Sequence, residues 1–440
     1  MLRTGTPYQT INRLSKIFNM SHFLKLCFRI FWRSYITINQ FTPMIINKIN
    51  SPFNSGINIY CSDNSFTNIA KNIFIFAYMA AFAFLSAAAA NLPGKLSEDG
   101  RTFWIDGGDL PLEGRGFADA EKLYQRIPDR LKAVTNVNRG VWIQGQCSAG
   151  MLFRFNVRKS NLLKVRWSVH YEKLAGGNMG PIVKSGADVY GWDSGRREWS
   201  FLNSARPARK EGNVQELWVP ASGDVMIYLP CYNVTEKFEV GVSPSAEITP
   251  VKHRVRGIEK PIVFYGTSIT QGGCVSRPGL AYPAFVSRRF DAPHVNLGFS
   301  GNGRMEIEMA DMLLEIDASA YVLDCLWNMN YGQVEERFEP FLRKLKAAKP
   351  DVPLLTLEMC AVGNKPNKAS RFIRGVVGKL KKEDPAKWAN LRHIQAERLF
   401  FDDSEGTVDR CHPNDWGMMK MSIEMIREIE AFIEEGAFKR

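Results

Sequence analysis

Ser268 stands in a turn that could support nucleophilic chemistry. It lies in GTSITQGG, which directly follows the short apolar run PIVFYG. A serine between a strand and the next helix holds its hydroxyl at the helix N-terminus, where backbone N–H groups point outward and the dipole favours an anion. This position suits a nucleophile whose attack creates an oxyanion. The alternative is an ordinary helix N-cap, a common place for serine.

An acid and a histidine lie three residues apart near the C-terminus. Asp409 and His412 occur in VDRCHPNDWG, just before the last predicted helix. A histidine needs an orienting carboxylate to act as a general base toward a serine, and a D-x-x-H pair in one tight loop can supply both groups. Five histidines lie beyond residue 90, at positions 170, 253, 294, 393 and 412. Only His412 has a nearby acid in a loop after a strand, although a lone histidine is often merely structural.

Two further loops carry groups that could stabilise an oxyanion. Gly301 and Gly303 lie in SGNGR after the apolar run HVNLGF, and Asn328 lies in WNMN after AYVLDCL. Glycine lets the backbone approach a ligand closely, and the Asn328 amide offers a donor. Both motifs also suit plain turns. Ligands of an open parallel sheet bind at the carboxyl ends of its strands, so we expect these loops to meet Ser268 there.

The segment that carries these motifs, residues 261–437, alternates strand-like and helical runs. This alternation predicts βαβ units and a parallel sheet covered by helices on both faces. The expected strands are PIVFYG, HVNLGF, AYVLDCL, VPLLTLEM and LRHIQAERL. The expected helices are YPAFVSRRF, MEIEMADMLLEI, VEERFEPFLRKLKAA and MMKMSIEMIREIEAFIEE.

Residues 97–245 show short apolar or alternating runs separated by turn residues, which predicts an antiparallel β-sandwich or jelly roll. The expected strands are GVWIQGQ, MLFRFNV, LLKVRWSVHY, ADVYGWD, ELWVP, DVMIYLP and FEVGV. The tryptophans of this segment include Trp142, Trp167, Trp192, Trp199 and Trp218. Core packing is favoured for them over stacking on sugar rings. Residues 246–260 are polar and form the expected linker.

Residues 71–90 have the layout of a secretory signal. They read KNIFIFAYMAAFAFLSAAAA, with a cleavage site expected near Ala88–Ala90. A transmembrane anchor is the alternative, but half of the run from Ile73 to Ala90 is Ala or Ser, which drive insertion weakly. Residues 1–70 are expected to be an unstructured extension or the product of a start site placed too far upstream. The mature protein is expected to be secreted or periplasmic, with no stable membrane insertion.

Charge and cysteine content exclude two other classes. Residues 1–90 contribute +7 to the net charge of +12, which leaves +5 for the rest of the chain. The rest has no Lys/Arg run of the kind that follows phosphates, so nucleic-acid binding is disfavoured. The six cysteines beyond residue 90 form no CxxC pair and no zinc-type spacing, so no metal site is predicted. Cys325 and Cys360 lie in apolar runs and are expected to be buried thiols.

GTSIT, NLGFSGNG, LWNMN and DRCHP resemble the four sequence blocks of the SGNH or GDSL-type hydrolases. The resemblance covers about residues 97–437. It is closest to a two-domain subfamily with an N-terminal β-sandwich and a flavodoxin-like catalytic domain. The front domain of that subfamily carries a GxDLY signature, and residues 186–190 read GADVY, with Val in place of Leu.

The resemblance implies a role for each matching residue. Ser268 would attack an ester carbonyl, His412 would accept and return its proton, and Asp409 would orient His412. The oxyanion would be held by the N–H groups of Ser268 and Gly301 and by the side-chain amide of Asn328. No metal or organic cofactor is implied.

The sequence departs from the family pattern at Thr267, Trp327, Arg410 and Cys411. These residues are expected at the pocket mouth, and Trp327 is a candidate substrate contact. Asp188 and Tyr190 of the GADVY motif lie two apart in a strand-like segment, so they point the same way. We expect them to bind the catalytic domain near the Ser268 crevice or a sugar hydroxyl. The alternative is that Asp188 holds a local turn.

These inferences predict a secreted serine esterase that removes short acyl groups, acetyl above all, from a small-molecule or glycan ester. A lipase or thioesterase for longer acyl chains is the first alternative, favoured if a long apolar groove lies near Trp327. A carbohydrate-binding protein with an inactive hydrolase domain is the second. The presence of Ser268, Asp409 and His412 argues against it.

Overall fold

The structure is a computed structural model, and it describes residues 92–438 apart from residues 161, 218, 219, 221, 252, 253, 360–365 and 400–404. The predicted extension (1–70) and the predicted signal (71–90) lie outside the described residues, as do Trp218, His253 and Cys360. Within the described part of the chain, no helix combines the length and the apolar character needed to cross a bilayer.

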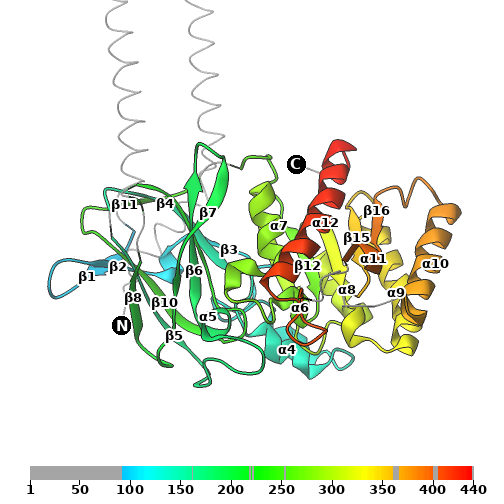
Figure 1. The fold of residues 1–440 in the computed structure, drawn as a ribbon, viewed down its shortest axis with the longest axis horizontal. Coiled ribbons are helices and arrows are strands. Elements are labelled where there is room, and N and C mark those ends of the chain that lie inside the picture. The colour runs from blue at the N-terminus through cyan, green and yellow to red at the C-terminus, as the bar shows by residue number, and fades with distance from the viewer. Residues whose placement is uncertain are drawn as a thin grey trace, which may run out of the picture. The chain divides into compact units, whose positions relative to one another are not determined.

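The first half of the described chain forms a β-sandwich (Figure 1). One antiparallel sheet has the order β1-β2-β10-β5-β8, and the other has the order β11-β4-β9-β6-β7, with β3 paired to β4. Alternation in the sequence sets the inner face, because Val165, Trp167 and Val169 of β5 are buried between the sheets while the residues between them are half-buried. The strands are β1 Gly94–Leu96, β2 Phe103–Asp106, β3 Leu112–Glu113, β4 Leu152–Arg158, β5 Leu163–Val169, β6 Ala187–Asp193, β7 Glu198–Ala205, β8 Asn213–Leu217, β9 Gly223–Tyr228, β10 Thr235–Val242 and β11 Glu247–Pro250.

The second half contains a parallel sheet of order β13-β12-β14-β15-β16, which is flavodoxin-like as expected. Its strands are β12 Ile262–Gly266, β13 His294–Gly298, β14 Ala320–Asp324, β15 Leu354–Leu357 and β16 Leu391–Ile394. Gly266 at the end of β12 is in register with Gly298 of β13 and with Asp324 of β14. These three strands therefore end at one level, and their following loops start side by side.

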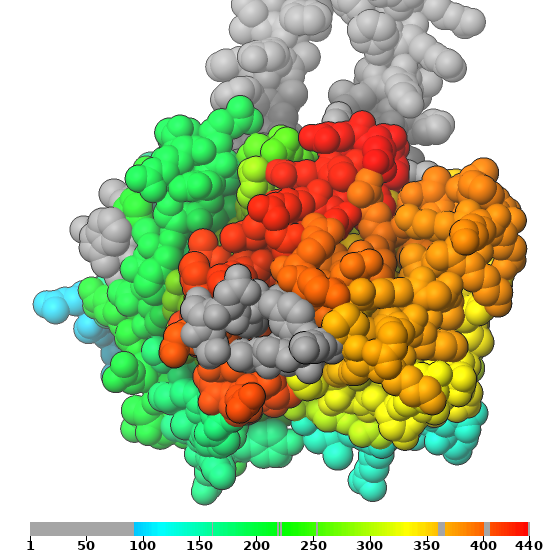
Figure 2. Space-filling view, turned by 45° about the vertical axis from the view of Figure 1, so that its right-hand side comes forward, coloured from blue at the N-terminus to red at the C-terminus, as the bar shows by residue number. Residues whose placement is uncertain are grey.

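Helices cover both faces of the parallel sheet. Val263 and Tyr265 of β12 face a core shared with α8, α9 and α10, whereas Ile262 and Phe264 face a core shared with α7 and α12. In Figure 2, α12 (red) crosses between the sandwich (green) and α10 (orange). The helices are α4 Arg139–Gly145, α5 Pro181–Ser185, α6 Ser268–Gln271, α7 Tyr282–Phe290, α8 Ile307–Leu314, α9 Tyr331–Ala348, α10 Lys368–Glu383, α11 Ala396–Leu399 and α12 Asp415–Glu434, and the 3-10 turns are η1 Gly107–Asp109, η2 Asp129–Ala133, η3 Pro278–Leu280 and η4 Leu326–Asn328.

The long connection between β3 and β4 fastens the sandwich to the parallel sheet. Ile127 and Val141 of this connection join the core on the α8–α10 face. The Arg126 guanidinium, 1% exposed, donates from Nη1 to the carbonyls of Asn296 and Gly298 at 2.9 and 2.7 Å. Burial lowers the pKa of Arg126 to about 10, which still leaves the group charged at neutral pH. The end of β13 is thus held by a residue of the front half.

Several sequence-based expectations about the elements need correction. Residues 140–146 were expected as a strand but form α4, because Asn138 caps the helix by accepting from the Gly140 N–H. Within the expected linker 246–260, Glu247–Pro250 forms β11 and pairs with β4. The sandwich therefore extends beyond the expected 97–245 boundaries at both ends. Strands β1, β2, β3 and β7 and helix α10 were not predicted.

Trp167 packs in the sandwich core, as expected, whereas Trp199 lies in a cluster that includes Ala284 of α7. Trp167 and Trp199 are buried, and Trp192 lies edge-on against Trp199 with ring centroids 5.4 Å apart. Trp142 differs, because it lines a surface pocket on the connection between β3 and β4. Cys325 is a buried free thiol, as expected.

Candidate active site

Ser268 is the first residue of α6, directly after β12 and Thr267, and 8% of the residue is exposed. Its Oγ lies 2.9 Å from Nε2 of His412, which comes from the loop before α12. The two residues are 144 positions apart in the chain, and the parallel sheet brings their loops together. The predicted serine and histidine are therefore in direct contact.

Asp409 and His412 occupy one tight loop. The Asp409 Oδ2 lies 2.8 Å from Nδ1 of His412, and its Oδ1 accepts from the backbone N–H of His412 at 2.7 Å and of Cys411 at 3.0 Å. The loop closes through the Thr407–Pro413 bridge, and Arg410 adopts a left-handed conformation with φ of 67°. Because Nδ1 faces a carboxylate, it carries the proton and leaves Nε2 free to accept from Ser268.

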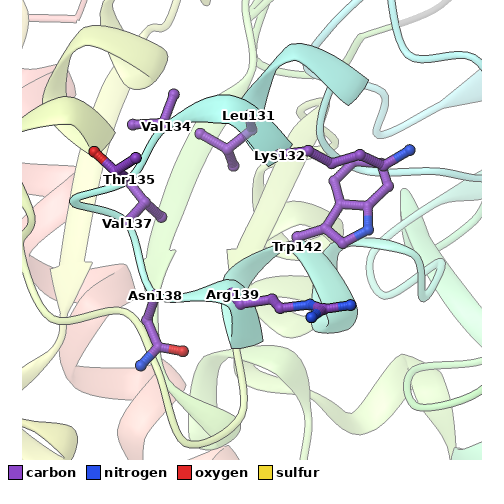
Figure 3. A pocket seen from close by; sticks show the side chains of 8 residues that line it. All are labelled: Leu131, Lys132, Val134, Thr135, Val137, Asn138, Arg139 and Trp142. Carbon is purple, nitrogen blue, oxygen red and sulfur yellow. The ribbon is translucent and has the colours of Figure 1, made fainter.

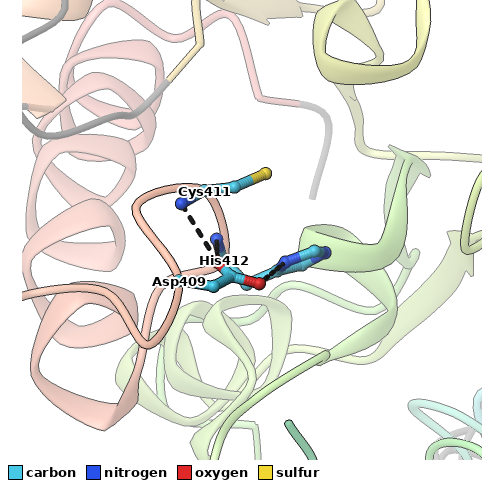
Figure 4. Close-up of side chains that lie close together, drawn as sticks. All are labelled: Asp409, Cys411 and His412. Carbon is cyan, nitrogen blue, oxygen red and sulfur yellow. Dashed lines mark hydrogen bonds and ion pairs between the residues drawn. The ribbon is translucent and has the colours of Figure 1, made fainter. Parts of the chain in front are cut away.

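Electrostatics keep the Asp409 carboxylate ionised. Burial raises its pKa, but hydrogen bonds from the backbone and ring of His412 and from the backbone of Cys411 outweigh burial and lower the pKa below its usual value. Figure 4 shows the Asp409 and His412 side chains together and the Cys411 side chain pointing away from them. A negative charge beside Nδ1 stabilises an imidazolium, as a general base requires.

Asn178, a residue of the front half, also contacts Asp409. Its Nδ2 donates to the Asp409 Oδ2 at 2.8 Å. From the same half, the Tyr232 hydroxyl donates to the Ser268 carbonyl at 2.9 Å. Sequence reasoning missed both residues. Their only local signal was a position in a turn or between strands, and their contacts arise from packing between the two halves.

The expected oxyanion donors lie in adjoining loops. Asn328 ends η4 and donates from Nδ2 to the Asn302 carbonyl at 2.6 Å, which uses one of its two amide hydrogens. Gln271 of α6 accepts from the Ser300 N–H at 2.8 Å, so the loop after β13 is fastened to the helix that begins with Ser268. Gly301 between these contacts has φ of 69°, a conformation that favours glycine.

A buried carboxylate lies behind the serine. Asp324 at the end of β14 accepts from the hydroxyls of Thr270 and Tyr282, each at 3.2 Å. Burial raises the pKa of Asp324 to about 6, although both hydrogen bonds oppose the shift. This group supports the turn that contains Thr270, two residues after Ser268.

The GADVY motif contacts the catalytic half of the chain. Asp188 is fully buried and Tyr190 is 3% exposed, and both accept hydrogen bonds from the Arg277 guanidinium. The expectation that these side chains point the same way toward the catalytic half is consistent with this contact. Asp188 has no exposed surface for a sugar hydroxyl, which favours the contact with the catalytic half for this residue, and substrate binding by Tyr190 stays a prediction. Trp327 is half-buried and packs against the α7–α12 core, with its ring nitrogen buried.

Cys274 and Cys411 lie near Asp409 but are not part of the hydrogen-bond chain of Ser268, His412 and Asp409. Burial raises the pKa of both the Cys274 and Cys411 thiols to about 11, and the Asp409 charge adds to both shifts. Among the described residues, Asp409, Cys411 and His412 form a group whose potential metal-ligating atoms lie within 4.8 Å of one another. Asp409 and His412 bind each other, however, and this arrangement is that of an acid and an oriented base.

Both halves of the described chain match models of known families. Residues 259–430 match the model of the GDSL-like lipase/acylhydrolase family. Residues 102–248 match the model of the N-terminus of SGNH-hydrolase-type esterases, named for its GxDLY motif. No curated protein matches this sequence.

Two solved structures share this arrangement of domains. A GDSL-like lipase from Bacteroides ovatus is 29% identical, with a TM-score of 0.65, over 76% of this chain and 98% of that one. A salicylyl-acyltransferase from a tetracycline biosynthetic pathway is 16% identical, with a TM-score of 0.58, over 75% of this chain and 97% of that one. At 16% identity, the similarity to the acyltransferase shows a shared fold alone.

Proposed function

We propose that this chain, which joins a GDSL-like lipase/acylhydrolase domain to the N-terminal domain of SGNH-type esterases, removes short acyl groups, acetyl above all, from carbohydrate esters. The chain is an esterase or acylhydrolase. The proposal goes further and names the residues that react, the length of the acyl group that is removed and the class of alcohol that is released. One observation carries it, namely the continuous hydrogen-bond chain from Ser268 through His412 to Asp409.

In the proposed reaction, the Ser268 Oγ attacks the ester carbonyl while Nε2 of His412 takes the hydroxyl proton. Asp409 stabilises the resulting imidazolium at Nδ1. The tetrahedral intermediate collapses, the C–O bond to the alcohol breaks, and Nε2 returns the proton to the leaving oxygen. A water molecule then repeats the sequence on the acyl-serine and releases the carboxylic acid, with no change in oxidation state.

The developing negative charge on the carbonyl oxygen would be held by three donors. These are the N–H groups of Ser268 and Gly301 and the second hydrogen of the Asn328 amide. The contact between Asn328 and the Asn302 carbonyl supports this arrangement, because it fixes the amide beside the loop of Gly301. Each such donor contributes about 3 kcal/mol to transition-state stabilisation.

Trp327 supports the preference for short acyl chains. It directly precedes Asn328 and packs against the α7–α12 core. A large ring next to an oxyanion donor fills space that a long acyl chain would need. An acetyl group needs little room, whereas a lipase would need an open apolar groove at this position.

A pocket next to the oxyanion loop supports a carbohydrate alcohol. It has a volume of about 680 Å³, and Figure 3 shows Trp142 on one side and Val134, Thr135 and Val137 on the other. Its helix α4 packs closely on the oxyanion loop, since a Cβ placed on Gly140 would lie 2.4 Å from the Asn302 side chain. The Lys132 Nζ lies 4.2 Å from the centroid of the Trp142 ring, so a sugar that stacks on this indole would displace the lysine.

Export is the remaining part of the proposal. The layout of residues 71–90 supports removal of a signal peptide and a secreted or periplasmic enzyme. N-terminal sequencing of the exported protein should begin close to Asn91. A mature protein that begins near Met1 would contradict export by this signal and favour an anchor.

A substrate panel tests the function. Purified protein should hydrolyse p-nitrophenyl acetate faster than the butyrate and octanoate esters, and it should release acetate from acetylated glycans. Ser268→Ala should remove all of these activities and retain the fold. A preference for octanoate would favour a lipase, and inactivity toward every ester together with glycan binding would favour the inactive carbohydrate-binding protein.

A further inference from the structure

We infer that Asn178 of the β-sandwich positions the catalytic carboxylate of Asp409, so that the front domain completes the triad. The inference rests on the proposed function, because it gives Asp409 its role. It starts from the 2.8 Å hydrogen bond between the Asn178 Nδ2 and the Asp409 Oδ2, which joins residues 231 positions apart.

The turn that presents Asn178 is built to hold it in place. Gly176 and Met179 form an isolated bridge, with the Gly176 N–H donating to the Met179 carbonyl at 3.1 Å. Gly177 has φ of 60°, as the first central position of a tight hairpin turn requires. Asn178 therefore lies at the tip of a closed turn, where its side chain binds Asp409.

Both sides of this turn are anchored in different cores. Leu174 before the turn packs against the sandwich core, and its carbonyl accepts from the Ser185 hydroxyl at 3.0 Å. Met179 after the turn packs against the core between the parallel sheet, α7 and α12. The turn thus spans the two domains, and its tip cannot move away from Asp409 without disturbing one of these contacts.

Asn178 binds Oδ2 of Asp409, the same oxygen that faces the His412 ring. The Asp409 Oδ1 is held by two backbone N–H groups of its own loop, whereas Oδ2 is shared by the His412 ring and Asn178. Rotation of the carboxylate would point Oδ2 away from Nδ1, and the second donor opposes that rotation. Asn178 acts only through Asp409 and is a positioning residue. Its loss should lower turnover on every ester, whatever the alcohol.

The test uses the whole protein with p-nitrophenyl acetate as substrate. Asn178→Ala should lower kcat about tenfold with KM unchanged within a factor of two, because misplacement of a triad member acts on the chemical step. Asn156→Ala is the matched control, since Asn156 makes the same kind of contact, 2.7 Å to the Asp224 carboxylate, inside the sandwich. The control should keep full kcat.

A double-mutant cycle separates positioning from general damage. In an Asp409→Ala background, adding Asn178→Ala should have no further effect on kcat, because the target of Asn178 is already gone. A kcat for Asn178→Ala equal to that of the control would overturn the inference alone. So would an undiminished tenfold loss in the Asp409→Ala background. Full activity of Asp409→Ala itself would overturn the triad, and the inference with it.

Discussion

The fully buried carboxylate of Asp188 in the sandwich forms an ion pair with Arg277 of the catalytic half, with 3.0 Å between Oδ2 and Nη1. The same carboxylate accepts from the Gly279 N–H at 2.8 Å and from the Ser204 hydroxyl at 2.9 Å. Burial raises the pKa of Asp188, although the Arg277 charge opposes the shift. The pair joins the GADVY strand to the segment between α6 and α7, close in sequence to Ser268.

Asp188→Ala should destabilise the protein by about 3 kcal/mol, because it removes the acceptor of the buried Gly279 N–H and of the Ser204 hydroxyl as well as the partner of Arg277. Denaturant unfolding measures the loss, and Asp193→Ala at the end of the same strand should cost about 1 kcal/mol or less. The remaining activity should fall by the same factor on p-nitrophenyl acetate and on an acetylated glycan. A loss confined to the glycan would instead give this strand a part in substrate selection.

Asn328→Ala should lower kcat about a hundredfold with a small effect on KM, since the amide acts on charge that develops in the transition state. Asn330→Ala is a close control, because Asn330 caps α9 two residues later without a place in the site. Steady-state kinetics of both variants on p-nitrophenyl acetate measure the difference in kcat between them. If only KM changed, Asn328 would bind the substrate and would not stabilise the oxyanion.

Trp142→Ala should raise KM for an acetylated glycan about fivefold, because stacking contributes about 1 kcal/mol. Kinetics on p-nitrophenyl acetate should stay unchanged, because the proposed sugar site would not contact this small ester. Trp192→Ala removes a sandwich tryptophan and serves as the control. Equal effects of Trp142→Ala on both substrates would exclude the pocket as the carbohydrate site.

Asp324→Asn should change how stability depends on pH. The pKa of Asp324 is about 6 in the folded protein and near 4 in the unfolded chain, so the folded state binds more protons between these values. The contribution of Asp324 to the free energy of unfolding is present below about pH 4 and is lost as the pH rises to about 6. The wild type minus variant difference in unfolding free energy should therefore fall by about 3 kcal/mol across this range. A constant difference would show that Asp324 keeps an ordinary pKa.

The sequence alone predicted the catalytic half well because its signals are local. Each buried strand is a short apolar run, and Ser268, Gly301 and Asn328 come two, three and four residues after the ends of β12, β13 and β14. Once the sheet is parallel and its strands end in register, those loops must meet. The pairing of Asp409 with His412 followed from a spacing of three residues within one loop.

The features that were missed either have an ambiguous local pattern or depend on a partner far away in the chain. GVWIQGQ was expected as a strand, but Val141 is buried and Ile143 is 46% exposed on helix α4, whose cap at Asn138 decides its structure. Helix α10 contains Gly375 and Gly378, which obscure its helical period. Asn178 sits in a Gly-rich turn that looks like a plain hairpin, and its value comes from a partner more than 200 residues away.

The most direct test of the account is covalent labelling of the nucleophile. A fluorophosphonate reacts with an activated serine by displacement of fluoride, and peptide mass spectrometry locates the adduct. The account predicts one adduct per chain, on the peptide that contains Ser268, with loss of esterase activity in proportion to labelling. It also predicts no adduct in Ser268→Ala or, over the same time, in His412→Ala. Stoichiometric labelling of another residue, or full inactivation with Ser268 unmodified, would contradict the account.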